Sequence, residues 1–248
     1  MAQWAQAGLW GLVAGSALLL GAAVGYAVRV PAWLLASVMA FGAGVLLSAV
    51  SFELLAESYH QGGLVSAAAG TIAGAVGYTA GNVWLGRRGA RHRKRSGRQP
   101  SEAAVAGSGL ALALGALLDG VPESAAIGVS LLDGGTVSTV TVTAVCLSNV
   151  PEGLSSSAGM RRAGRRPRYV FGVWGAIAAA SVVAAVLGNT VVGGLTDPVV
   201  AAVTAVAAGA ILAMIADTMI PEAFEEAHLA IGLVTVAGYL LSFTLSHA

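Results

Sequence analysis

SGLALALGALLDGVPESAAIGVSLL, residues 108–132, is the stretch that decides the fold of this 248-residue chain. A bilayer core about 30 Å thick is crossed by roughly 20 residues of apolar helix, so the stretch is long enough to span it. Asp119 and Glu123 lie near its middle, four residues apart and therefore on one face of a helix. Ionisable groups inside a membrane span are costly and mark functional positions, so both acids are candidates for a site.

The composition of the whole chain agrees with a membrane protein. Hydrophobic residues make up 56% and charged residues 10%, which cannot provide the polar surface of a water-soluble protein. Apolar stretches recur along the chain, and they are too long for barrel strands. We therefore expect an all-α integral membrane protein that forms a single transmembrane domain over 1–248. Eight transmembrane helices are predicted, at 7–28, 32–57, 62–85, 103–132, 136–160, 169–192, 198–222 and 228–246.

The thirteen Lys and Arg residues all fall in connections of the same parity. Seven lie in 87–98, five in 161–168, and the last is Arg29. By the positive-inside rule these connections are cytoplasmic and both termini lie outside, with Asp133 and Asp197 in the opposite connections. The expected location is the plasma (inner) membrane, which the chain crosses several times.

The segment 86–101 is predicted to be a flexible basic cytoplasmic loop. It lacks the interleaved aromatic residues of a nucleic-acid-binding patch, so no nucleic-acid partner is expected. Membrane orientation and contact with anionic lipid explain its charge. Its one histidine, His92, gives little support to a metal-sensing role for this segment.

A second V-P-E motif follows the first by 29 residues, in CLSNVPEGLSSSAG at 146–159. A proline inside a helix removes a backbone donor and kinks the helix, which frees a carbonyl oxygen one turn earlier. The acids of the two spans are expected to converge near the membrane midplane. The predicted metal site consists of five oxygen-bearing residues: Asp119, Glu123, Ser148, Asn149 and Glu152. Proton transfer by the glutamates, and helix-bridging hydrogen bonds from the serine and the asparagine, are the alternatives.

A second internal similarity links 44–58 with 209–224 and aligns Glu57 with Glu222 at an offset of 165 residues. The repeated units have opposite orientations in the membrane, as in transporters built from inverted repeats around the two central spans, the fourth and fifth. Four acids near span ends are candidates for pathway or gate residues, with snorkelling or helix capping as the alternative: Glu53, Glu57, Asp217 and Glu222.

On these residues the chain resembles the ZIP (Zrt/Irt-like) family of divalent-metal transporters over nearly its whole length. That family carries a His-Asn-x-Pro-Glu-Gly motif in its fourth span and a similar motif in its fifth, where this chain has LDGVPES and LSNVPEG. The resemblance places Asp119 and Ser148 at the family's histidines, and Glu123 and Glu152 at its glutamates. It implies a permease that moves a divalent cation into the cytoplasm.

The departures from the family bear on the choice of metal. Glu53 stands where the family has a histidine, and Ser181 and Val182 stand where it has a Glu-Pro pair, which leaves open whether the site holds one metal ion or two. All the remaining ligands are oxygen donors, which suit Mn²⁺, Mg²⁺ or Ca²⁺, whereas imidazole favours zinc. We still expect zinc as the substrate, because the Irving–Williams order favours it, with Mn, Fe, Cd or Mg as alternatives. The expected partners are the metal cation and the lipid bilayer, with a homodimer as a candidate assembly.

Two other functions compete with transport. The missing histidines favour a non-transporting membrane metal sensor of the same fold. An intramembrane aspartyl protease could use Asp119 and Asp217, but the Gly-x-Gly-Asp signature of that class is absent. Zinc-protease and P-loop signatures are absent as well, and we expect no enzymatic activity.

The orientation can be tested with Ser96→Cys. Because the thirteen basic residues are expected to lie in the cytoplasm together, an impermeant thiol reagent should label this cysteine only after the membrane is opened. Labelling in intact cells would reverse the orientation of every span.

Overall fold

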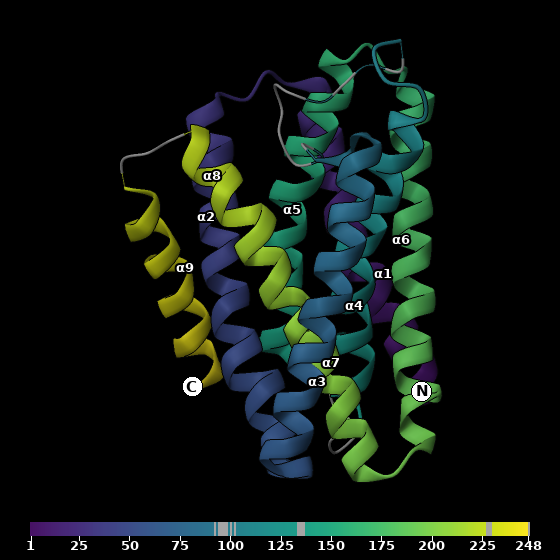
Figure 1. The fold of residues 1–248 in the computed structure, drawn as a ribbon, viewed down its shortest axis with the longest axis vertical. Helices are drawn as coiled ribbons and strands as arrows, with labels where there is room; N and C mark the ends of the chain where they lie inside the picture. The colour runs from purple at the N-terminus through teal and green to yellow at the C-terminus, as the bar shows by residue number, and fades with distance from the viewer. Residues whose placement is uncertain are drawn as a thin grey trace.

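The chain forms a bundle of helices that run up and down beside one another (Figure 1). This computed structural model describes residues 1–91, 93, 99, 101, 103–132, 137–226 and 230–247. Within that part of the chain there is no strand, which confirms the predicted all-α class. The α-helices are α1 (Gln3–Ala27), α2 (Ala32–Ala49), α3 (Ala56–Leu85), α4 (Ser108–Ser130), α5 (Thr139–Arg162), α6 (Pro167–Thr190), α7 (Asp197–Met214), α8 (Ile220–Glu226) and α9 (Ile231–Ser246). Short π-helical or 3₁₀ segments are η1 (Val50–Leu55), η2 (Gly86–Ala90), η3 (Val192–Gly194) and η4 (Ile215–Met219).

Five helical runs in the described chain are long and apolar enough to cross a membrane. One of them, Ala32–Ala90, has 59 residues and includes both predicted spans 32–57 and 62–85. A straight helix of that length would measure about 90 Å, roughly three bilayer cores. The run instead bends at Gly63, whose φ of 69° is readily adopted only by glycine. The other four runs are Gln3–Ala27, Ser108–Ser130, Pro167–Gly194 and Asp197–Glu225.

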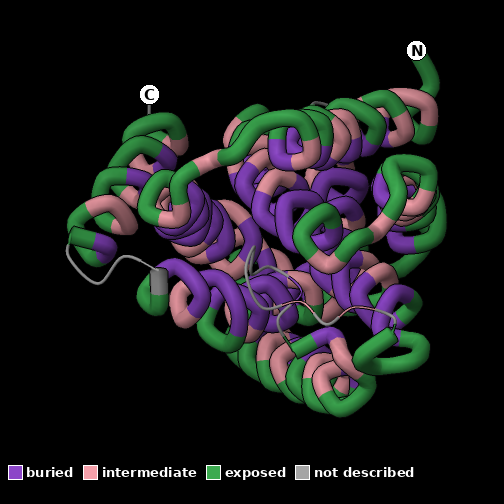
Figure 2. Tube along the Cα trace, turned by 90° about the horizontal axis from the view of Figure 1, so that it is seen from above, coloured by how far each residue is buried: buried purple, intermediate pink, exposed green. Residues whose placement is uncertain are grey.

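The predicted spans 136–160 and 228–246 correspond to α5 and α9, which are not among these five runs. Helix α9 is apolar but has only 16 residues. Helix α5 has 24 residues, but its serines, threonines and charged residues lower its hydropathy. This helix is mostly buried and packs against α1 and α2, so it needs little apolar surface facing lipid. Figure 2 shows the same division across the bundle, with buried residues on the inner sides of the helices and exposed residues on the outer sides.

Neighbouring helices come together at glycines. A Cβ atom on Gly74 of α3 would fall on the carbonyl oxygen of Val206 in α7, and one on Gly238 of α9 would fall on that of Phe41 in α2. Helices α1 and α5 pack in the same way, as do α4 and α6. In a lipid environment such small residues let helix backbones approach closely and gain van der Waals contact.

The two similar segments 44–58 and 209–224 share a break in their helical geometry. The π-helical segments η1 and η4 begin at Val50 and Ile215, which are separated by the same 165 residues as Glu57 and Glu222. π-Helical turns are rare and often occur at functional sites. The sequence similarity is therefore accompanied by a matching local structure.

The basic connections lie at one end of the bundle. Arg161 at the end of α5 donates to the carbonyl oxygens of Tyr26 and Ala27, at the end of α1. Arg165 Nη2 donates to Ser108 Oγ, at the start of α4, over 2.9 Å. Both chain termini lie toward the opposite end, which is the lower end in Figure 1. The predicted features at His92, Ser96 and Asp133 lie outside the described residues.

Substitution of Gly74 tests the close packing of α3 on α7. Gly74→Ala should lower the thermal midpoint of the purified protein, because overpacking a tight contact costs typically about 1–3 kcal/mol. Gly77→Ala is the matched control, since a Cβ atom there would meet no atom within 4 Å. Equal midpoints for the two variants would contradict this packing.

Candidate functional site

Asp119 in the middle of α4 forms an ion pair with Arg93. Arg93 Nη2 lies 2.8 Å from Asp119 Oδ1, and Arg93 Nε lies 2.9 Å from Asp119 Oδ2, so the guanidinium contacts both carboxylate oxygens. Arg93 is 2% exposed and Asp119 is 1% exposed. A two-point contact of this kind is the strongest geometry that an arginine and a carboxylate form.

Two residues of α3 complete the surroundings of this ion pair. Arg93 Nη2 also donates to Tyr78 OH over 2.8 Å, and Arg93 Nη1 donates to Asn82 Oδ1 over 2.7 Å. Tyr78 OH in turn donates to Asp119 Oδ1 over 2.6 Å. Burial by itself would lower the pKa of Arg93, but Asp119, with Tyr78 and Glu222, raises it above its ordinary value. The guanidinium therefore stays charged in this buried place.

Glu123 lies one turn further along α4 and faces α5. Ser148 Oγ donates to Val145 O over 2.9 Å and lies 3.4 Å from Glu123 Oε1. Glu123, Ser148 and Glu152 are each at most 3% exposed. Both V-P-E prolines lie inside continuous helices, Pro122 in α4 and Pro151 in α5. The two motifs are thus brought to the interior, where Glu123 and Ser148 meet.

The other two predicted ligands have partners elsewhere. Asn149 Nδ2 donates to Ala14 O of α1 over 2.8 Å, which is the helix-bridging role considered as its alternative. Asp119 is held by Arg93. Among the described residues, no group of three or more His, Cys, Asp or Glu side chains is arranged to hold a metal ion. The carboxylates of Asp119, Glu123 and Glu152 therefore do not form a ready-made metal site in this conformation.

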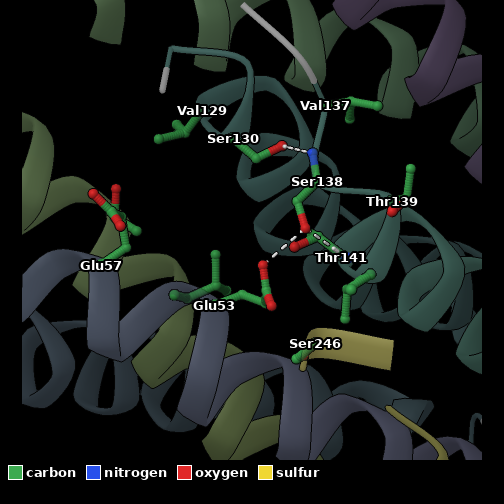
Figure 3. A pocket seen from close by; sticks show the side chains of 12 residues that line it. Glu53, Glu57, Val129, Ser130, Val137, Ser138, Thr139, Thr141 and Ser246 are labelled. Atoms are coloured by element: carbon green, nitrogen blue, oxygen red, sulfur yellow. Dashed lines mark hydrogen bonds between the residues drawn. The ribbon is translucent and has the colours of Figure 1, made fainter. Parts of the chain in front are cut away.

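A polar pocket of about 370 Å³ opens where α4 ends and α5 begins. Figure 3 shows Glu53 pointing toward Ser138 and Thr141 across it, while Glu57 lies further away at its side. Ser138 Oγ donates to Glu53 Oε2 over 2.9 Å. Thr141 is 3% exposed, and its Oγ1 has no hydrogen-bond partner among the described residues. We call this the Glu53 pocket; its polar lining is Glu53, Glu57, Ser130, Ser138, Thr139, Thr141, Thr204 and Ser246.

A second polar cavity, of about 650 Å³, lies between the end of α3 and the η4–α8 segment. We call it the Asp217 cavity; its polar and charged lining is Thr79, Asn82, Arg87, Arg91, Asp217, Thr218 and Glu222. Thr204 lines the Glu53 pocket and Asp217 lines the Asp217 cavity. The helical rise between these two residues along α7 and η4 is about 20 Å, which separates the two spaces. Of the four acids expected near span ends, Glu53 and Glu57 thus line the Glu53 pocket, and Asp217 and Glu222 line the Asp217 cavity.

The buried acids lie between the two spaces. Along α4 the order is Ser130 at the Glu53 pocket, then Glu123, then Asp119. Asn82, which holds Arg93, is itself in the wall of the Asp217 cavity. Glu123 is therefore nearer the Glu53 pocket along α4, and the Asp119–Arg93 pair is joined to the wall of the Asp217 cavity through Asn82.

Arg93 was not among the predicted residues of the site. The segment 86–101 is predicted to be a flexible basic loop, whereas its described part includes η2 and the buried Arg93. One signal was present: a lone aspartate in the middle of a span needs a partner. The protease alternative gains no support, because Asp119 is paired with Arg93 while Asp217 is exposed and accepts a 3.3 Å hydrogen bond from Thr79.

Comparison with known proteins gives no assignment for this chain. No protein-family model matches it, and no curated protein matches it.

Tyr78→Phe tests the hydrogen bonds around the ion pair. The variant keeps the ring but removes a hydroxyl that bonds both Asp119 and Arg93, and it should destabilise the protein by about 1–3 kcal/mol. Tyr59→Phe is the control, because Tyr59 is 53% exposed. If the thermal midpoint fell no further for Tyr78→Phe than for Tyr59→Phe, the network would contribute little to stability.

Proposed function

We propose that this chain is a membrane permease for divalent metal cations, which pass the buried carboxylates of α4 and α5. The observation that carries the proposal is the place of Glu123 and Glu152. Both are almost fully buried in proline-containing helices, and the Glu53 pocket and the Asp217 cavity lie at different heights of the same bundle. Carboxylates are costly in such an interior and are characteristic of ion pathways.

The arrangement of the helices supports an eight-span transporter. Five runs have the length and apolar character of spans, Ala32–Ala90 contributes two legs on either side of Gly63, and α5 and α9 add two more. The matching π-helical breaks in η1 and η4 are consistent with two repeats around α4 and α5. In transporters of that kind the substrate site lies at the interface of the repeats, and alternating access moves one part against the other.

The chemistry of the pathway favours cations. Carboxylates and hydroxyls face the Glu53 pocket, and the contact between Glu123 and Ser148 offers the same donor types in the interior. Oxygen donors suit hard divalent ions, while the Irving–Williams order keeps zinc competitive. With the basic connections in the cytoplasm, passage from the Glu53 pocket to the Asp217 cavity is uptake.

Glu152→Gln tests transport. The amide keeps the size of the side chain but removes the charge that offsets a divalent ion, a loss of several kcal/mol in a low-dielectric site. Influx of Zn²⁺, Cd²⁺, Mn²⁺, Fe²⁺ and Mg²⁺ into proteoliposomes, with and without a proton gradient, should fall to background. Glu225→Gln makes the same chemical change at an exposed position and should retain flux. A robust wild-type flux that Glu152→Gln leaves unchanged would place the ion path elsewhere.

One observation favours the non-transporting sensor as a second candidate. Arg93 already neutralises Asp119, which reduces the negative charge available to an ion. The double variant Asp119→His/Ser148→His separates the two functions, because it restores two imidazoles beside Glu123 and Glu152. A wild-type protein without flux, together with zinc flux in the double variant, would identify the native chain as a non-transporting relative.

A further inference from the structure

The four oxygen atoms that hold the Arg93 guanidinium form a binding place for a cation. They are Asp119 Oδ1, Asp119 Oδ2, Tyr78 OH and Asn82 Oδ1, and each lies 2.7–2.9 Å from a guanidinium nitrogen. Carboxylate, amide and hydroxyl oxygens are also the groups that bind hard divalent ions. The guanidinium therefore occupies a place whose chemistry suits the proposed substrate.

We propose that Arg93 is a tethered competitor of the transported cation. Its guanidinium fills the cation position at Asp119 and must leave before an ion can pass from Glu123 to the Asp217 cavity. This inference rests on the proposed function and concerns the regulation of the same site. Arg93 and the carboxylate that it occupies are both part of this chain, so the local concentration of this competitor is fixed by the fold.

The position of Arg93 suits a competitor. Asn82 holds the guanidinium and also lines the Asp217 cavity, so the side chain lies between Asp119 and that cavity. Asp217 and Glu222 lie in the wall of the same cavity and offer carboxylates toward which a displaced guanidinium can move. Release of Arg93 from Asp119 therefore need not carry its charge into the apolar part of the bundle.

The surrounding chain makes room for Arg93. A Cβ atom on Gly115, one turn before Asp119 in α4, would fall on Arg93 Cδ. Gln99 Nε2 donates to Arg93 O over 2.7 Å and to Ser156 O over 3.1 Å, which fixes the backbone of Arg93 against α5. Arg93 follows η2 and belongs to none of the long helices, so its side chain can leave without breaking a helix.

The test measures Mn²⁺ binding by the purified full-length protein as the Mn²⁺-dependent shift of its thermal midpoint. A site open only a fraction of the time binds more weakly by that fraction, so removing a competitor that is present nine-tenths of the time raises affinity about tenfold. Arg93→Gln should therefore bind Mn²⁺ at least about tenfold more tightly than wild type. Arg88→Gln should not, because Arg88 is an exposed arginine of η2 that lies outside the lining of the Asp217 cavity.

The double variant Arg93→Gln/Asp119→Asn removes both charges. Compared with Arg93→Gln alone, it should bind Mn²⁺ more weakly and have a higher thermal midpoint. If Arg93→Gln fails to fold, Gly115→Ala provides an independent test. The added methyl group displaces the Arg93 side chain while the charges of Arg93 and Asp119 both remain. Gly115→Ala should therefore also tighten Mn²⁺ binding, and the double variant Gly115→Ala/Asp119→Asn should not. An Arg93→Gln or Gly115→Ala protein that folds and binds Mn²⁺ no more tightly than wild type overturns the proposal.

Flux measurements separate this inference from the proposed function. Tighter Mn²⁺ binding by Arg93→Gln with no cation flux in any variant would support the competitor and reject the permease. Flux in the wild type, with Mn²⁺ binding and flux both unchanged in Arg93→Gln, would support the permease and reject the competitor.

Discussion

A carboxylate buried among apolar helices has to be compensated, and Arg93 compensates Asp119. Removing one partner of such a buried pair commonly costs about 3–5 kcal/mol, because the other charge is left without compensation. The pair joins α4 to the segment after η2, and Tyr78 and Asn82 join both to α3. Helix α3, the segment after η2 and helix α4 are thereby held together at one point. The absence of a side chain at Gly115 is one condition for this arrangement.

The second constraint is the close contact of helix backbones through glycine. It operates between α3 and α7, between α2 and α9, between α1 and α5, and between α4 and α6. The last two contacts surround the helices that carry the V-P-E motifs. They let α5 be rich in hydroxyl and amide side chains, because its neighbours cover it on several sides. The polar interior thus depends on an apolar exterior supplied by other helices.

Composition was sufficient to predict the helical class, and charge placement was sufficient to predict that the basic connections lie together. The pattern of apolar residues separated the expected spans 32–57 and 62–85, and the helical run Ala32–Ala90 is broken close to that boundary, at Gly63. Glu123, Ser148 and Glu152 are buried, as their place in the spans predicts, whereas Asn149 donates to Ala14 of α1. The partner of Asp119 was not predicted, since nothing local distinguishes Arg93 from the six other basic residues of 87–98. Only long-range packing selects it.

The π-helical segments have a consequence for interpreting substitutions along these helices. An α-helix rotates by about 100° per residue, and a π-helical turn accommodates one more residue than an α-helical turn. Beyond η1 and beyond η4 the angular phase of the side chains is therefore displaced by about one residue. A residue-by-residue scan through Val50 or Ile215 will show two stretches of helical periodicity that are out of register with each other. Glu57 and Glu222 then belong to the second stretch, and a helical wheel drawn from the first would assign them to the wrong face.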